Sequence, residues 1–175
     1  RGPCVNCHMG GSTEPAASQK NHTFEATTHD GSGNITTIFH LTTCNTAACH
    51  NSGMSVASLE GQKDGFADAK AVLAALMSNS VANYLSLNIS TTSNNNYRTV
   101  PVNAYGALMN QLYMNEDPCA YVHNHLYARR LLFDSIDWMQ DGDLDGTINI
   151  SGFATGATAA AFLKPGSLAT AVTRP

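Results

Sequence analysis

Apolar residues recur at helical spacing through most of the chain after Leu59, with polar residues between them. This spacing predicts a first helix whose apolar positions run from Phe66 to Met77, and further helices over residues 103–113, 117–138 and 151–163. Strand signals are weak throughout, and the intervening segments are rich in Ser, Thr, Asn and Gly. We therefore predict a mostly α, loop-rich protein with little regular strand.

Polar and small residues indicate where the predicted helices begin and end. Asp64 is placed to cap the first helix and Ser151 to cap the last. Residues 78–101 are rich in Ser, Thr and Asn, which predicts a long loop. The last helix is rich in Ala and Gly, so we expect it to pack closely against a neighbour.

Residues 1–55 differ from the rest because they contain few aliphatic side chains. So small an apolar set cannot bury a core of its own. Within this segment, residues 30–34 predict a turn and 35–41 a short extended piece. We therefore expect a cofactor-binding segment, 1–55, and a helical scaffold, 56–175, packed together as one compact unit.

Composition narrows the range of partners. The chain has 175 residues, of which 13% are charged, and a formal net charge of −4. An acidic balance argues against nucleic acid as a partner, and no apolar run approaches the length of a transmembrane segment. Because the chain begins with Arg1, we expect that a signal peptide or longer leader has been removed, or that the chain was produced without it.

Two cysteine pairs, each followed at once by a histidine, lie in residues 1–55. The first is Cys4-Val5-Asn6-Cys7-His8, and the second is Cys44-Asn45-Thr46-Ala47-Ala48-Cys49-His50. The CxxCH pattern is typical of covalent haem c, in which both thiols bond to the porphyrin and the histidine binds the iron. A four-residue spacer achieves the same attachment by looping outward. The motifs predict two covalent haem c groups, which would also supply the apolar area that this segment lacks.

Paired cysteines have two other interpretations. They form zinc ribbons with a tetrahedral thiolate site, or disulfides in secreted proteins. Neither alternative uses the histidine that follows the second cysteine of both pairs. The fifth cysteine, Cys119, has no evident mate, so we expect a buried and inert thiol, with an intermolecular disulfide as the alternative.

Each haem iron needs a sixth ligand or an open site, and this choice separates an electron carrier from a catalyst. With His8 and His50 as the proximal ligands, the remaining histidines are His22, His29, His40, His123 and His125. We predict that His40, four residues before Cys44, and His22 are the distal ligands. Two such bis-histidine haems would have low reduction potentials, because methionine ligation raises the potential.

The other candidate ligands fit less well. His29 beside Asp30 is typical of an exposed turn residue, although Asp30 is placed to orient it as a ligand. His123 either reaches a haem or packs against its own helix. Met9 and Met54 are the methionine alternatives, and the number of histidines argues against them.

The stretch 141–149 matches the first part of an EF-hand calcium loop. Asp stands at loop positions one, three and five, Gly at position six and a hydrophobe at position eight. Position twelve is Gly152, where the pattern requires a bidentate Glu, and this departure favours an acidic turn that ends a helix. The candidate calcium ligands are Asp141, Asp143, Asp145 and Thr147. Calcium bound here would be weak and structural, as in extracellular modules.

Two further segments carry a family resemblance. They are Ala120-Tyr121-Val122-His123-Asn124 and Arg130-Leu131-Leu132-Phe133-Asp134-Ser135-Ile136-Asp137-Trp138, and the closing Thr173-Arg174-Pro175 fits with them. Together with the mixture of CxxCH and CxxxxCH motifs, they resemble secreted multihaem c-type cytochromes of metal-reducing bacteria. Members usually carry more haems in longer chains, so this chain is either a reduced relative or a processed fragment.

The resemblance implies electron transfer at or beyond the cell surface, with the periplasm as the alternative location. Some similar cytochromes form filaments, so the expected partners are other copies of the chain, other redox proteins and extracellular acceptors. The small side chains of 156–163 offer a surface for close approach between copies. The alternative functions are a monomeric shuttle, a haem peroxidase or reductase with one open iron site, and a zinc-binding module. The surplus of histidines argues against an open site, so we do not expect an enzyme.

Overall fold

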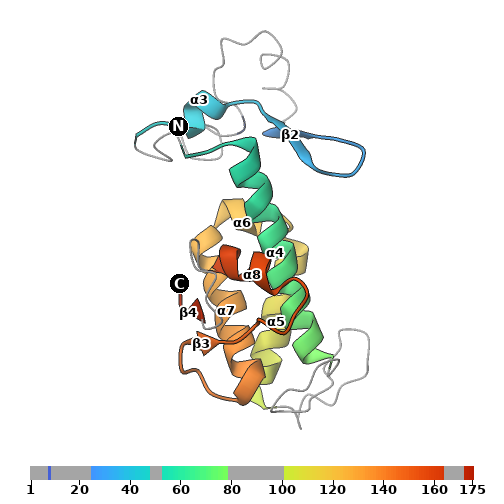
Figure 1. The fold of residues 1–175 in the computed structure, drawn as a ribbon, viewed down its shortest axis with the longest axis vertical. Coiled ribbons are helices and arrows are strands. Elements are labelled where there is room, and N and C mark those ends of the chain that lie inside the picture. The colour runs from blue at the N-terminus through green and yellow to red at the C-terminus, as the bar shows by residue number, and fades with distance from the viewer. Residues whose placement is uncertain (1–7, 9–24, 48–52, 79–100, 164–171) are drawn as a thin grey trace. The chain divides into compact units, whose positions relative to one another are not determined.

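The computed structural model describes residues 8, 25–47, 53–78, 101–163 and 172–175 (Figure 1). The chain divides into two compact units, residues 1–61 and 62–175, and each is described by itself. The predicted mostly α, loop-rich fold is confirmed, because the described strands form only two short two-stranded sheets.

A β-hairpin precedes the second cysteine pair in the first unit. Strand β1 (Thr27–His29) pairs antiparallel with β2 (Ile35–Ile38). The carboxylate of Asp30 accepts hydrogen bonds from two backbone N–H groups of the intervening turn, at 2.8 and 3.0 Å. Gly33 has a φ of 84° in this turn, a left-handed conformation that favours glycine. The predicted turn over 30–34 is therefore confirmed.

Two helices follow the hairpin. The single turn α3 (Leu41–Cys44) enters the second cysteine pair, and α4 (Val56–Met77) begins after it. Ser55 and Ser58 cap α4 reciprocally, since each backbone N–H donates to the other's hydroxyl, at 2.8 and 3.0 Å. The predicted cap at Asp64 is wrong, because these serines satisfy the first N–H groups two turns earlier.

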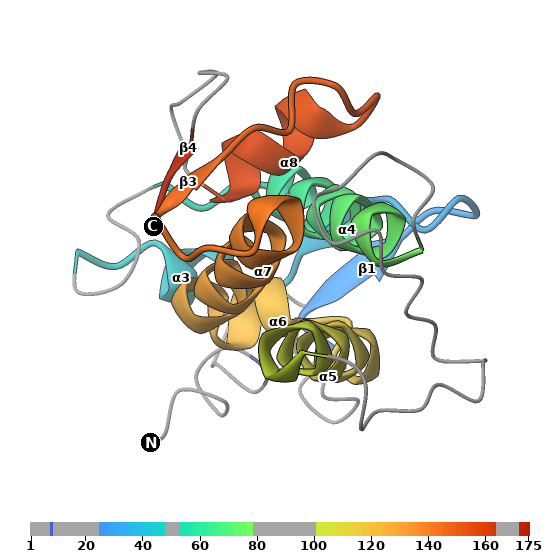
Figure 2. The same cartoon turned by 90° about the horizontal axis from the view of Figure 1, so that it is seen from below.

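The second unit is built from the rest of α4 and four further helices. These are α5 (Val102–Glu116), α6 (Ala120–His123), α7 (His125–Asp141) and α8 (Gly156–Leu163). Figure 2 shows α7 between α8 and α5, and α7 contacts both. Large apolar side chains from four of these helices fill the core: Leu73, Leu108, Met114, Leu132, Phe133, Ile136, Met139, Phe162 and Leu163.

The close packing expected of the last helix is present between α4 and α8. A side chain on Gly65 would overlap the Cβ of Phe162. Glycine at this position therefore allows α4 and α8 to approach closely. The centroid of the Phe66 ring lies 5.8 Å from that of Phe162 and 5.9 Å from that of Tyr121. Such tilted aromatic contacts stabilise the core beyond the area they bury.

Two predicted helices differ from the observed ones. The third is broken by Asn124, whose backbone (φ −151°, ψ 58°) is not helical, so α6 and α7 are separate. The last helix begins at Gly156, and the predicted cap Ser151 instead donates its hydroxyl to Asn149 Oδ1 at 2.7 Å. A side chain at 156 would overlap the carbonyl of Ile150, so glycine allows the preceding turn to close. The predicted loop 78–101 lies outside the described residues except at its two ends.

A second small sheet fixes the C-terminal residues to α7. Strand β3 (Thr147–Ile148) pairs antiparallel with β4 (Val172–Thr173). Immediately after β4, the guanidinium of Arg174 donates to both carboxylate oxygens of Asp134, at 2.8 and 2.9 Å. Such bidentate pairs fix orientation as well as position.

Candidate haem site and acidic loop

Part of the predicted haem-binding set lies within the described residues. His8 and Cys44 are described and are both half-buried. The remainder of the two motifs, Cys4, Cys7, Cys49 and His50, lies outside the described residues, as does His22. Covalent attachment and proximal ligation therefore stay predictions.

His40 and Cys44 lie at the two ends of α3. The backbone carbonyl of His40 accepts a hydrogen bond from the N–H of Cys44 at 3.1 Å, so the two residues stand one helical turn apart. His40 is only 1% exposed, although histidine is intermediate in burial among the residue types. An imidazole shielded from water, one helical turn from a predicted haem-attachment cysteine, is chemically suited to bind iron.

The side chain of Asn45 joins the two sides of the second motif. Its Nδ2 donates to the carbonyl of Met54 (2.9 Å), and its Oδ1 accepts from the N–H of Met54 (2.8 Å). Cys49 and His50 lie between these residues in the sequence, so the two bonds fix where the chain enters and leaves the motif. The sequence pattern did not indicate this role, because one amide reaching across nine residues leaves no periodic signal.

The histidine of the hairpin, His29, is exposed and lies in the strand β1 directly before the turn. The carboxylate of Asp30 is engaged within the turn, where it also accepts from Asn34 Nδ2 at 2.9 Å. The turn therefore uses the group that was expected to orient His29 as a ligand.

His123 and His125 lie on two different helices, one at the end of α6 and the other at the start of α7, and both are exposed. The Nδ1 atom of His123 lies 3.5 Å from Oδ1 of Asp117. Cys119 is exposed as a residue, so the expectation of a buried thiol is wrong. Partial desolvation of its sulfur, and then the Asp117 carboxylate, raise the pKa of this thiol and keep it protonated at neutral pH.

The acidic loop follows α7 directly. Gly142 ends the helix with a φ of 86°, and Gly146 has a φ of 81°. Three aspartates of the loop each accept a hydrogen bond from a nearby backbone N–H: Asp141 from Asp143 (2.9 Å), Asp143 from Leu144 (2.8 Å) and Asp145 from Thr147 (2.8 Å). The bonds from Thr147 lower the pKa of Asp145. Among the described residues, no three His, Cys, Asp or Glu side chains converge as a metal site.

Asp137, one helical turn before the loop, has its carboxyl group against it. Its Oδ2 accepts a hydrogen bond from the N–H of Gly146 at 2.9 Å, and the residue is 1% exposed. Burial raises the pKa of Asp137 to about 6; the Gly146 bond opposes this rise, while the charges of Asp145, Asp141 and Asp134 add to it. Sequence reasoning missed Asp137, which precedes the loop motif and lies on the buried face of α7.

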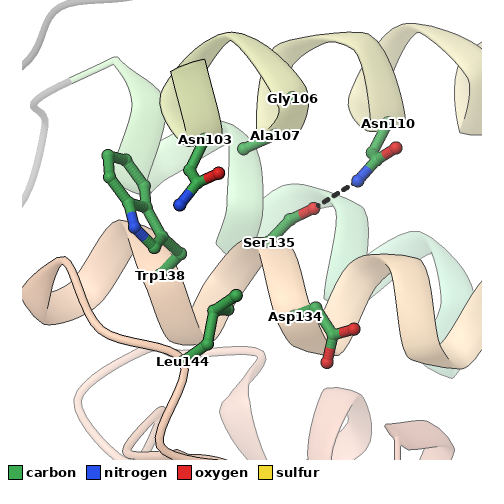
Figure 3. A pocket seen from close by; sticks show the side chains of 8 residues that line it. All are labelled: Asn103, Gly106, Ala107, Asn110, Asp134, Ser135, Trp138 and Leu144. Atoms are coloured by element: carbon green, nitrogen blue, oxygen red, sulfur yellow. Dashed lines mark hydrogen bonds between the residues drawn. The ribbon is translucent and has the colours of Figure 1, made fainter. Parts of the chain in front are cut away.

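A small pocket lies between α5 and α7 (Figure 3). Its lining residues are Asn103, Gly106, Ala107, Asn110, Asp134, Ser135, Trp138 and Leu144. Asn110 Nδ2 donates to the hydroxyl of Ser135 at 2.9 Å on its wall. The volume is about 140 Å³, whereas sites for drug-sized ligands occupy roughly 300–1,000 Å³. The pocket therefore has room for a few water molecules and not for a haem.

Relatives of the chain share 29% identity with it. The alignment with C-type polyheme cytochrome OmcC of Geobacter sulfurreducens covers 84% of this chain and 21% of the relative. The alignment with C-type polyheme cytochrome OmcB of the same species covers 84% of this chain and 22% of the relative. The chain is a relative of polyhaem c-type cytochromes.

The resemblance to polyhaem cytochromes that the sequence indicated is therefore confirmed. The chain spans about a fifth of the length of these polyhaem cytochromes. No family model matches the chain, and no solved structure matches it. In the part of the chain that the structure describes, no helix has both the length and the apolar character needed to cross a membrane.

Proposed function

We propose that the chain is an electron-transfer segment that carries two covalent haem c groups, one on Cys4 and Cys7 and one on Cys44 and Cys49. The observation that carries the proposal is the histidine directly after the second cysteine of both pairs, in a relative of polyhaem cytochromes. A zinc or disulfide interpretation gives those two histidines no function.

The residues present fit the haem group. Bound haem iron would supply one-electron redox chemistry. The thiols of each pair would hold the porphyrin, and His8 and His50 directly follow the second cysteine in the sequence, where the motif requires the proximal ligand. The burial of the His40 imidazole supports a role as a distal ligand. A histidine in the sixth position of the iron would exclude water and substrates from it. Two irons with histidine on both sides, His40 and His22 being the predicted distal ligands, would favour a carrier over a peroxidase or reductase, because neither iron would keep an open site.

The proposed location follows from the same relationship. We place the chain outside the cytoplasm, at or beyond the cell surface, with the periplasm as the alternative. Its partners there are redox proteins or extracellular electron acceptors, and other copies of the chain. Its net charge of −4 and low charged fraction of 13% argue against nucleic acid as a partner.

Mass spectrometry and thiol counting on the purified, denatured protein test the proposal. We expect the mass of the polypeptide plus two haems, and haem staining retained after denaturing electrophoresis. Four of the five cysteines would be bonded to haem, so a single thiol, Cys119, should react after reduction and chelation. The mass of the bare polypeptide with five reactive thiols would contradict the haem assignment and favour zinc or disulfides.

A further inference from the structure

The acidic loop has the backbone of a calcium loop through its first eight positions. The helix α7 ends as the loop begins, and Gly146 at position six has the left-handed backbone that this sharp turn requires. Ile148 at position eight is 2% exposed and lies in the short strand β3. The pattern fails at position twelve, because Gly152 has no side chain to donate.

Asp137 provides the carboxylate that position twelve lacks. Its Oδ2 is held by Gly146 inside the loop. Its Oδ1 is buried, and no N–H or O–H group of the described residues donates to it. A buried carboxylate oxygen without a donor costs free energy unless a cation or a proton compensates it.

The charges around Asp137 make a cation the fitting partner. Asp141 and Asp145 lie near its carboxyl group, and the side chain of Asp145 is within hydrogen-bonding reach of it. Arg174 already pairs with both oxygens of Asp134, and no Lys or Arg forms an ion pair with the loop carboxylates in the described segments. Each loop hydrogen bond engages Oδ1 of its aspartate, so the second carboxylate oxygen can turn toward a metal.

We propose that Asp137, Asp141, Asp143 and Asp145, with the backbone carbonyl of Thr147, bind one Ca²⁺ ion. In this proposal Asp137, which lies in the preceding helix α7, takes the place of the glutamate at position twelve of an EF-hand loop. An all-oxygen ligand set with adaptable geometry suits Ca²⁺, whereas Mg²⁺ requires a stricter octahedron and Zn²⁺ prefers nitrogen and sulfur. The ion draws together carboxylates that do not converge without it, and so fixes the loop against α7 and β3.

Calorimetric titration of the purified holoprotein with CaCl₂, after treatment with EDTA, tests the site directly. We expect one ion per chain with a Kd of about 10⁻⁴ to 10⁻³ M, the range of extracellular calcium modules. At 10 mM CaCl₂ the unfolding equilibrium constant should then fall roughly 10- to 100-fold. Substituting MgCl₂ should give clearly weaker binding.

Two charge-matched variants separate ligation from general electrostatic attraction. Asp137→Asn should weaken calcium binding at least tenfold, while Asp134→Asn, on the same helix, should stay within about twofold of the wild type. Asn keeps the shape of the side chain and removes a crowded charge, so Asp137→Asn should fold. The absence of calcium binding by the wild type up to 10 mM would overturn the site. Equal losses in the two variants, or no loss in Asp137→Asn, would overturn the role of Asp137.

Discussion

At the residue scale, two buried polar side chains, His40 and Asp137, lie at the two proposed metal sites. His40 and Asp137 are each 1% exposed. Oδ1 of Asp137 is buried where no N–H or O–H group of the described residues donates to it, and such burial is costly unless a cation or a proton compensates it. His40 stands one helical turn from a predicted haem-attachment cysteine, and Asp137 stands against a loop of three further aspartates. The proposed partners are metal centres in both cases, iron for the imidazole and calcium for the carboxylate.

Removal of His40 should expose one iron. In His40→Ala, we expect about half of the haem to change from low spin to high spin, because one of two irons loses its distal ligand. Optical absorption and electron paramagnetic resonance of the ferric holoprotein measure this change. His29→Ala is the matched control, since His29 is exposed at the end of β1, and its spectrum should equal that of the wild type. If the His40→Ala protein stays fully low spin, His40 is not a distal ligand, and His123 is the next histidine to test.

The sequence identifies residues whose role is local and misses those whose role is tertiary. His40 was predicted from its spacing to Cys44, and the structure adds its burial without testing ligation. Asn45 and Asp137 were not predicted, because each acts on a backbone group nine residues away. No helical or strand period connects such pairs, so they emerge only when the chain is folded.

At the scale of elements, the apolar period predicts the helices well and their ends poorly. The existence of α4, α5, α7 and α8 follows from a stripe of buried side chains. Their ends depend on individual polar contacts, such as the reciprocal bonds of Ser55 and Ser58. The break at Asn124 also lies within an apolar pattern that continues on both sides, which explains why one helix was predicted where two exist.

The packing of α4 against α8 should depend on a single missing side chain. Gly65→Ala places a methyl group against Phe162, and we expect a net loss of about 1–2 kcal/mol in the free energy of unfolding, as overpacking outweighs better helix propensity. Gly61→Ala, in the same helix with nothing near its Cβ position, should instead gain about 0.5–1 kcal/mol. Urea unfolding of the holoprotein measures both. Similar stabilisation by the two substitutions would show that α4 and α8 do not pack this closely.

At the scale of the whole molecule, the two units differ in how they exclude water. In the described part of the first unit, the buried hydrophobic residues are Ile35 and Leu59, whereas the second unit has a large apolar core. The described residues of the first unit, taken alone, bury too little apolar area to be more than marginally stable without a further apolar component. Two porphyrins would provide that component, which supports the proposal that the haem groups organise the first unit.

Self-assembly into a filament is a prediction at the scale of the whole molecule. Two haems span a short distance, and a charged fraction of 13% offers little repulsion between copies. Of the small residues of 156–163, Gly156, Ala159 and Ala160 are buried within the second unit, whereas Ala157, Thr158 and Ala161 are exposed. The exposed His123 is a candidate contact residue, as a distal ligand to the iron of a neighbouring copy, with His22 as the alternative.

We therefore predict that the holoprotein forms fibres through a head-to-tail contact in which His123 binds a neighbouring iron. Such a heterologous contact does not close on itself, so it continues to grow. Light scattering and electron microscopy should show fibres for the wild type and single chains for His123→Ala, with one iron per chain turning high spin. His125→Ala is the matched control, because His125 is also exposed and lies just across Asn124, and this variant should still form fibres. A monodisperse wild-type protein of one chain, with both irons six-coordinate, would establish the monomeric shuttle instead.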